Sequence, residues 1–262
     1  MTKSSQLGAG GKVAIALCLT SIGGFVDAVG YIALFQIFTA NMSGNSIHIG
    51  MYLANLDWLG LLRPTCAVVA YVGAMIVTRI AVQVGGRCRI RRVVSLTLTV
   101  EALLLLLFAH TTPAMYLGQM VDLHSPTYFA LVALLAVAMG IQTASLTHIG
   151  ALTIYTTFVT GSLTKFAESF TRALFWAYDR IQQNGDVSDT IRLVPQQEDV
   201  RDAVFLASVW LCYLFGAALG TLAKYRWELR SLYIPAAALM VFIAVDQVYP
   251  VGVEEEQHQR TG

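Results

Sequence analysis

The sequence contains very little charge for its length. Only 13% of its 262 residues are Asp, Glu, Lys or Arg, whereas 56% are hydrophobic and the mean hydropathy is +0.62. Soluble domains carry about 25% charged residues, because a water-exposed surface has to be covered by polar groups. This shortage of charge excludes an ordinary soluble domain. It predicts an integral membrane protein of the all-α class, in which a helical bundle spans the lipid.

The chain also lacks the motifs of several function classes. Its four cysteines (Cys18, Cys66, Cys88, Cys212) are scattered and form no CxxC pair, which argues against a disulfide framework or a zinc site. There is no GxSxG, Walker or GxGxxG motif and no metal-ligand spacing of His, Asp and Glu. The net charge of +1 has no basic stripe, so nucleic-acid binding has no support. We therefore expect no enzyme activity, no metal and no cofactor.

Six apolar runs are long enough to cross a bilayer, which takes about 20 residues per helix. They lie at about 13–37, 65–86, 93–110, 128–148, 202–224 and 231–249. Two further segments, 45–62 and 162–178, contain polar or charged residues. Each charge at the bilayer centre costs about 2.5–3.5 kcal/mol. We therefore predict about six spans plus two broken or re-entrant helices, with 179–201 as a polar loop.

The distribution of basic residues favours six spans over eight. With six spans and a cytoplasmic N-terminus, most Lys and Arg residues face the cytoplasm, as the positive-inside rule requires. Eight spans would place the group formed by Arg87, Arg89, Arg91 and Arg92 outside. The basic residues after position 224 fit this scheme poorly. The sequence thus predicts one membrane domain over 1–262, multi-pass in the cell inner membrane.

Three short strings recur in the second half of the chain. FTANMSGNSIHIG (38–50) resembles YTTFVTGSLTKFA (155–167), and GGFVDA (23–28) resembles MGIQTA (139–144), with Gly23 placed opposite Gly140. VGAMIVT (72–78) resembles FGAALGT (215–221). We interpret the strings as an internal duplication, with pseudo-repeats at 13–110 and 128–249. Three spans in each half give the second repeat an inverted topology, as in many secondary transporters.

The first apolar run contains an acidic residue, Asp27, flanked by Gly23, Gly24 and Gly30. Acids inside membrane spans are rare and usually face a cavity, a partner or a permeation path. We therefore predict that Asp27 binds a proton, a cation or a cationic substrate group. The alternative is a carboxylate that is hydrogen-bonded to a neighbouring helix purely for packing.

The polar segments around Gly44 and Gly161 are predicted to interrupt helices. Unwound backbone at membrane depth needs protein or water around it, and paired interruptions point to a transporter site. The alternative is a pair of ordinary helix N-caps. Besides Asp27, the predicted substrate- or ion-binding residues are Asn41, Ser43, Gly44, Asn45, Gln142, Thr143, Thr157, Thr160, Gly161 and Ser162.

His48 and Glu101 are candidates for a proton relay with Asp27. Histidine titrates near neutral pH, and Glu101 lies within the apolar run VEALLLLLF. The alternative interpretation makes His48 a hydrogen-bonded packing residue and Glu101 a carboxylate paired with a neighbouring helix.

The stretch GGFVDAVGYIALFQIFTANMSGN (23–45) resembles the signature of the YoaK-like membrane proteins, a mostly bacterial family of uncharacterised function. The matching positions are Gly24, Asp27, Ala28, Gly30, Tyr31, Phe38, Asn41, Ser43, Gly44 and Asn45. Thr157 and Gly161 match a T-x-x-x-G segment in the later half. The resemblance covers about residues 13 to 249. It implies a multi-pass membrane fold but no particular activity.

Together these features predict secondary transport of a small solute through an intramembrane carboxylate. The expected partners are the lipid bilayer, an unidentified solute and a proton or sodium ion. Six spans are few for a transporter, so we expect a homodimer. The alternative is a membrane scaffold or sensor that transports nothing and whose polar residues only join helices.

Overall fold

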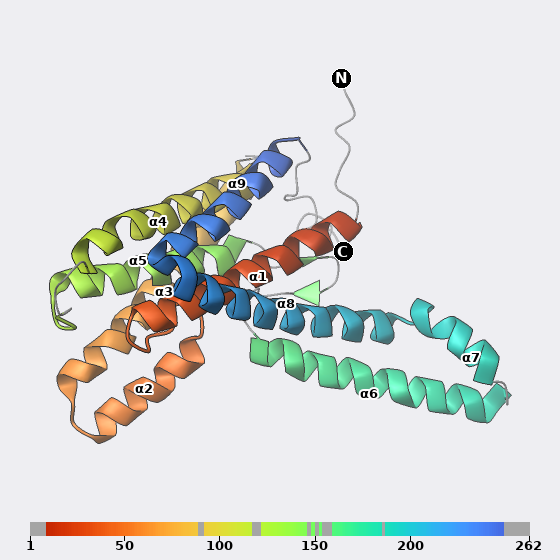
Figure 1. The fold of residues 1–262 in the computed structure, drawn as a ribbon. Helices are drawn as coiled ribbons and strands as arrows, with labels where there is room; N and C mark the ends of the chain where they lie inside the picture. The colour runs from red at the N-terminus through yellow and green to blue at the C-terminus, as the bar shows by residue number, and fades with distance from the viewer. Residues whose placement is uncertain are drawn as a thin grey trace.

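The computed structural model describes residues 9–88, 92–116, 122–145, 148–149, 152–153, 159–184 and 187–248 (Figure 1). Their elements are α1 (Ala9–Ala33), α2 (Met42–Ala54), α3 (Trp58–Arg87), α4 (Val93–Tyr116), α5 (Pro126–Ser145), β1 (His148–Ile149), β2 (Leu152–Thr153), α6 (Val159–Asn184), α7 (Val187–Leu193), η1 (Val194–Gln196), α8 (Glu198–Trp227), η2 (Glu228–Leu232) and α9 (Tyr233–Val248). The predicted all-α class is confirmed. The only strands in these ranges, β1 and β2, form a two-residue antiparallel pair.

Within the described residues, five segments are long and apolar enough to cross a membrane: Val13–Ala33, Trp58–Arg87, Val93–Thr112, Pro126–Ser145 and Glu198–Gln247. The last segment contains α8, η2 and most of α9, and so covers the fifth and sixth apolar runs of the sequence. The chain is therefore a polytopic helical membrane protein.

One predicted boundary in the N-terminal half is wrong. The helix predicted over 13–37 ends at Ala33, because Phe35 and Gln36 have φ values of 51° and 68°, which an α-helix cannot contain. The segment 45–62, predicted as a broken or re-entrant helix, covers most of α2 and the start of α3 and is interrupted between them. Asp57 begins the new helix by accepting a hydrogen bond from the Gly60 amide at 2.8 Å.

The predicted polar loop at 179–201 is also wrong, because most of it is helical. Helix α6 continues to Asn184, and α7, η1 and the first turn of α8 follow. Helix α6, which provides the first residues of this stretch, has an amphipathic surface. On α6 an apolar stripe is exposed at Leu163, Phe170, Leu174 and Ile181, and an opposite exposed stripe carries Lys165, Glu168, Arg172 and Asp179.

The most extensive helix interfaces join the two halves of the chain. Helix α1 packs along α8, and α3 packs along α5. Helix α4 lies between α5 and α9, while α2 packs on α3 and α6 packs on α8. Figure 1 shows α6, α7 and the first part of α8 extending away from the other helices.

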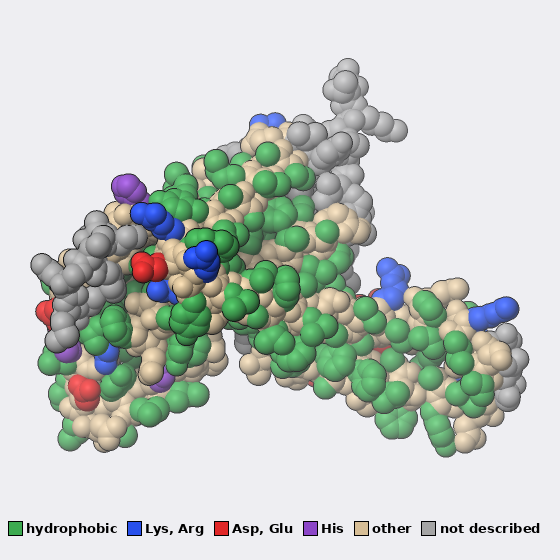
Figure 2. Space-filling model, in the orientation of Figure 1, with side chains coloured by type: hydrophobic (Ala, Val, Ile, Leu, Met, Phe, Trp, Pro, Cys, Tyr) green, Lys and Arg blue, Asp and Glu red, His purple; other side chains and the backbone are tan. Residues whose placement is uncertain are grey.

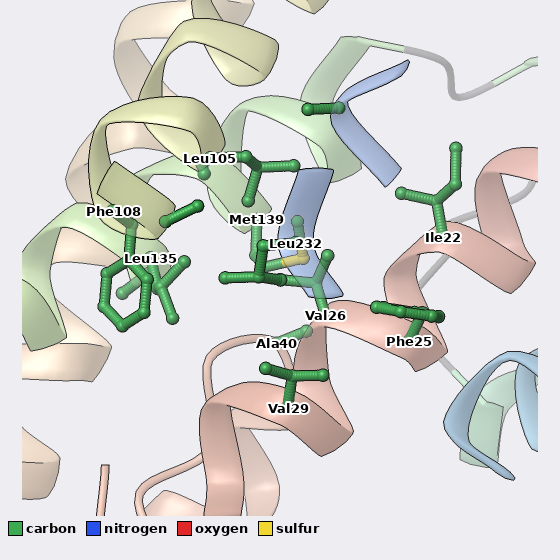
Figure 3. Close-up of a cluster of buried hydrophobic side chains, with 14 of the residues drawn as sticks. Ile22, Phe25, Val26, Val29, Ala40, Leu105, Phe108, Leu135, Met139 and Leu232 are labelled. Carbon is green, nitrogen blue, oxygen red and sulfur yellow. The ribbon is translucent and has the colours of Figure 1, made fainter. Parts of the chain in front are cut away.

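The core lies where α1, α4, α5 and η2 meet. Val26, Leu105, Met139 and Leu232 point toward one another there and are fully buried (Figure 3). Outside the core, hydrophobic side chains cover most of the visible face of the molecule (Figure 2). A surface of this kind suits lipid rather than water.

Small residues let the backbones of α1 and α8 approach closely. A Cβ at Gly216 would overlap the Ser21 carbonyl, and a Cβ at Gly220 would lie 2.5 Å from the Phe25 carbonyl oxygen. In lipid, helices associate through such close packing, because burying apolar surface gains little there.

Candidate functional site

Asp27 accepts four hydrogen bonds inside the protein. Its Oδ1 accepts from the Thr39 amide at 2.8 Å, the Ala40 amide at 2.7 Å and the Thr39 hydroxyl at 3.1 Å. Its Oδ2 accepts from the Tyr213 hydroxyl at 2.7 Å. The side chain is 3% exposed. Both carboxyl oxygens of Asp27 are thus satisfied by groups of the protein itself, as buried polar atoms usually are.

The segment between α1 and α2 is folded back on itself by the two asparagines of the motif. The buried Asn45 pairs with the backbone of Phe38: its amide nitrogen donates to the carbonyl at 2.8 Å, and its oxygen accepts from the amide at 3.0 Å. Asn41 is the N-cap of α2 and accepts from the Gly44 amide at 3.3 Å and the Ser43 hydroxyl at 2.7 Å. These contacts make the predicted interruption a tight, fully bonded turn.

The glycines of the motif provide room for that turn. A Cβ at Gly30 would lie 2.5 Å from the Thr39 methyl group, and a Cβ at Gly44 would lie 2.6 Å from the Phe38 ring. The Tyr31 and Phe38 rings pack with centroids 4.4 Å apart. The alternative prediction of a helix N-cap is thus observed for Asn41. The predicted binding residues Asn41, Ser43, Gly44 and Asn45 lie together in the turn that also contains Thr39, which donates hydrogen bonds to Asp27.

A second helix crossing in the chain has the same arrangement as the crossing at Asp27. Tyr71 of α3 donates its hydroxyl to Thr143 of α5 at 2.9 Å. A Cβ at Gly140, three residues before Thr143, would lie 2.5 Å from the Tyr71 carbonyl oxygen. In the first crossing, a Cβ at Gly24, three residues before Asp27, would overlap the Tyr213 carbonyl oxygen.

These contacts correct the pairing of Gly23 with Gly140 and agree with the six-residue strings aligned end to end, in which Gly24 stands opposite Gly140. The counterpart of Gly140 in the crossing contacts is Gly24 rather than Gly23, so Thr143 occupies the position of Asp27. Gln142 then corresponds to Val26, which is a buried core residue. The two crossings are therefore alike in geometry and different in charge.

The second polar segment lies only partly within the described residues, and Thr157 falls outside them. Thr160 is exposed and Gly161 is half-buried in the first turn of α6, while Ser162 is buried. The described part of this segment is thus the start of α6. It provides no contact that joins it to Asp27.

Gln142 and Glu101 are both fully buried, in α5 and α4 respectively. The Gln142 amide nitrogen donates to the Leu19 carbonyl of α1 at 2.5 Å, but its oxygen has no hydrogen-bond partner among the described residues. Neither carboxyl oxygen of Glu101 has a hydrogen-bond partner in the described structure. His48 is half-buried, and its ring stacks on the Phe38 ring with the two centroids 6.3 Å apart. No hydrogen bond between described residues joins Asp27, His48 and Glu101.

Sequence reasoning missed the partners that α3, α8, α4 and α9 provide. Tyr71 and Tyr213 each follow a small or polar residue within an apolar span, and no motif marks them. Two further buried contacts were missed: Ser95 of α4 donates to Asp246 of α9, and Ser145 of α5 donates to Thr97 of α4 at 2.8 Å. The only feature of the sequence that could have indicated these contacts is a hydroxyl or acidic residue within an apolar run.

A cavity of about 590 Å³ lies between α1, the end of α8 and the start of α9, away from Asp27. Its lining is apolar, including Phe25, Leu219 and Ile234, and Arg226 is its one charged residue. It offers few polar groups to a hydrophilic solute. Within the described ranges, no group of three or more His, Cys, Asp or Glu residues could hold a metal ion.

The buried carboxylates, the bonded turn and the lipid-type surface define a polytopic α-helical membrane protein with polar contacts in its core. The chain belongs to the family described as "Protein of unknown function (DUF1275)", whose model matches residues 15–245. It is similar to the UPF0700 transmembrane protein YoaK of Bacillus subtilis (strain 168), with 26% identity over 219 residues, 84% of this chain and 86% of that protein. The resemblance to YoaK-like proteins is thereby confirmed. No solved structure matches the chain.

Proposed function

We propose that this protein is a secondary transporter of a small solute, built from two inverted pseudo-repeats in the inner membrane with its N-terminus in the cytoplasm. Six helices, α1, α3, α4, α5, α8 and α9, cross the bilayer in this proposal. The pseudo-repeats contribute three each, so that the second repeat is inverted relative to the first.

The observation that carries the proposal is the pair of matched crossings. In each, a glycine packs on a tyrosine carbonyl, and a side chain three residues later bonds the hydroxyl of the same tyrosine. The crossings join α1 to α8 and α5 to α3, so each pairs an element of one repeat with an element of the other. Transporters with inverted repeats place their sites at such an interface and move one repeat against the other.

Within this proposal the residues have different tasks. The segment from Phe38 to Asn45 forms one wall of the solute path, and the start of α6 at Thr160 and Gly161 forms the corresponding wall. Asp27 holds the first wall in place, since its carboxylate is occupied by Thr39, Ala40 and Tyr213. Gln142 and Thr143 provide neutral groups at the second crossing.

The test is solute flux in proteoliposomes that contain only the purified full-length protein. A panel of amino acids, carboxylic acids, sugars and ammonium compounds is added outside, and uptake is followed with and without imposed pH and sodium gradients. Gradient-dependent uptake of one solute class supports the proposal. A folded protein that moves no member of the panel under any gradient contradicts it.

The four bonds to Asp27 favour a second candidate function, a scaffold or sensor that transports nothing. A carboxylate that is fully satisfied by its own protein can serve packing alone. Under this alternative, Asp27→Asn lowers folded yield, because an amide cannot accept at both positions, and no variant changes flux. A variant such as Thr160→Val, which lies outside the Asp27 bonds, separates the two candidates: it alters flux without loss of yield only in a transporter.

A further inference from the structure

Glu101 is the one acid in the described core whose oxygens are both unpartnered. Its side chain is 0% exposed, and the residues around it on α4, including Leu98, Ala102 and Leu105, are buried and apolar. An ionised carboxylate without partners in such surroundings costs many kcal/mol, so a group placed there takes up a proton instead. Protonation adds one O–H donor, which then needs an acceptor.

The register of α4 on α5 identifies that acceptor. Helices α4 and α5 run antiparallel (Figure 1), and Ser145 of α5 bonds Thr97 of α4 at 2.8 Å. From this contact, Glu101 lies one helical turn along α4, and Gln142 lies about one turn back along α5, on the same side. At 1.5 Å per residue, the two positions differ in height by only about 1.5 Å.

Both residues also lie on the facing stripes of their helices. Thr97 and Glu101 lie four residues apart on α4, and Gln142 and Ser145 lie three residues apart on α5. Side chains at these spacings are neighbours on one helix surface. Glu101 and Gln142 are both 0% exposed, as expected for side chains between two packed helices.

The orientation of the Gln142 amide is fixed by α1. The Leu19 carbonyl can only accept, so the group 2.5 Å from it must be the amide nitrogen. The Gln142 oxygen therefore points elsewhere, and it is also buried without a partner. One carboxyl and one amide oxygen, both buried and unpartnered, therefore lie at about the same height on α4 and α5, and a single proton shared between them would satisfy both.

We propose that Glu101 and Gln142 form a proton-binding site, in which protonated Glu101 donates a hydrogen bond to the Gln142 side-chain oxygen. The site rests on the proposed function for its role: it carries the proton that is coupled to solute movement. Release requires water to enter between α4 and α5, where the Glu101 proton passes to a water molecule and leaves a carboxylate. Asp27 is separate from this site, because both of its oxygens already accept hydrogen bonds from Thr39, Ala40 and Tyr213.

Other titratable groups lie on the elements that pack against α4, and none of those described pairs with Glu101. Tyr128 on α5 bonds the Leu34 carbonyl at 2.8 Å, Tyr71 on α3 bonds Thr143, and Asp246 on α9 bonds Ser95. Arg79 on α3 is half-buried and has a partner of its own, while Glu228 and Arg230 in η2 are exposed. A change of pH that acts on Glu101 therefore acts on an isolated carboxyl.

Infrared difference spectroscopy of the full-length protein in lipid tests the site. At pH 7 we expect a protonated-carboxyl C=O stretch that shifts in D₂O and is lost in Glu101→Gln. Glu101→Gln keeps the shape of the neutral acid, so it should fold. The band should persist in Asp27→Asn and Asp246→Asn. In Gln142→Met it should move to higher frequency, because the carboxyl loses its hydrogen bond. Absence of the band, or a band unchanged in Glu101→Gln, overturns the proposal.

Flux measurements separate this inference from the proposed function. In proteoliposomes, Glu101→Gln should abolish the dependence of uptake on a pH gradient, while the matched control Thr112→Ala, on the same helix, retains it. If the wild-type protein moves no solute but shows the Glu101 band, transport is wrong and the proton site stands. If uptake is coupled to a pH gradient in Glu101→Gln as in the wild type, the site carries no coupled proton and the inference fails.

Discussion

The Tyr213 hydroxyl of α8 lies 2.7 Å from Oδ2 of Asp27 on α1, and the two residues are 186 positions apart in the sequence. This hydrogen bond joins α1, the first span, to α8 in the second half of the chain. The same tyrosine presents its carbonyl to Gly24. One residue thus fixes both how close the helices come and how the acid between them is satisfied.

Replacing Tyr213 should destabilise the protein more than replacing Tyr71. Tyr213→Phe removes a hydrogen bond to a carboxylate, worth about 1.5–3 kcal/mol, whereas the hydroxyl of Tyr71 bonds the neutral Thr143, worth about 0.5–1.5 kcal/mol. Thermal unfolding in detergent, followed by intrinsic fluorescence, measures the difference. Tyr225→Phe, at an exposed position, should leave the transition unchanged. Equal losses at Tyr213 and Tyr71 would contradict an ionised Asp27.

The close approach of α1 and α8 should not tolerate a methyl group. Gly216→Ala would place a Cβ against the Ser21 carbonyl, so the helices must separate and the Tyr213–Asp27 bond must lengthen. We expect a marked loss of folded yield and of thermal stability. The matched control is Gly73→Ala in α3, where nothing lies within 4 Å of the new Cβ. It should be neutral or gain up to about 1 kcal/mol from helix propensity. A Gly216 variant as stable as that control would rule out the tight crossing.

The turn before α2 should depend on both ends of the Asn45 amide. Asn45→Asp keeps the oxygen that accepts from the Phe38 amide, but it replaces the nitrogen that donates to the Phe38 carbonyl. Two buried acceptors then face each other, and we expect a loss of about 1–3 kcal/mol. Size-exclusion profiles and unfolding temperature report it. Ser46→Ala, at an exposed position of α2, should change neither. A similar loss of stability in Ser46→Ala would contradict the claim that the Asn45–Phe38 pairing holds the turn.

Helix α6 should lie at the boundary between lipid and water. Its exposed apolar stripe includes Leu174 and its exposed charged stripe includes Glu168, the pattern of an interfacial helix. In a cysteine-free background in intact membranes, Glu168→Cys should react with a water-soluble maleimide and Leu174→Cys should not. Both should react after solubilisation and unfolding. Labelling of Leu174→Cys in the membrane at the rate of Glu168→Cys would place this face in water.

The ionic contact of α6 with α8 should weaken with salt. The Asp199 carboxylate accepts a hydrogen bond from Arg172 Nε at 2.6 Å and raises the pKa of that guanidinium. Because Arg172 stays charged, the contact should persist from neutral pH upward. As the Arg172 side chain is largely exposed, we expect Arg172→Gln to lower the unfolding temperature only slightly at low salt and not at high salt, measured against Arg180→Gln.

The apolar runs predicted where the long helices lie, because a bilayer leaves a chain few alternatives to a helix. The boundaries at Ala33 and Asp57 could not be predicted in this way. The first is set by two non-glycine residues with positive φ, Phe35 and Gln36, which the Asn45–Phe38 pairing holds in place. The second depends on an aspartate cap within a segment whose charges indicated only polarity. Helix α6 was predictable in principle, since its apolar residues recur at helical spacing.

The candidate site was predicted in part. The motif around Asp27 identified the acid, the asparagine cap and the glycines, because these residue types are unusual within an apolar run. It could not identify Tyr213 or Tyr71, since a tyrosine in a span has many uses and its partner depends on tertiary packing. The motif also could not show which of the two buried acids has hydrogen-bond partners. Asp27 stands in the conspicuous motif and is fully bonded, whereas Glu101 stands among leucines and has no partner.

The distance in sequence between Asp27 and Tyr213 has a consequence for biosynthesis. A ribosome adds about 5–20 residues per second, so roughly 10–40 s separate the emergence of the acid from that of the hydroxyl that completes it. During that interval α1 is expected to be in the membrane already. Oδ1 of Asp27 can then bond the turn that follows α1, but Oδ2 lacks its partner Tyr213. Translation that stops before residue 213 leaves the acid half-satisfied in lipid, and such fragments should be early targets of membrane quality control.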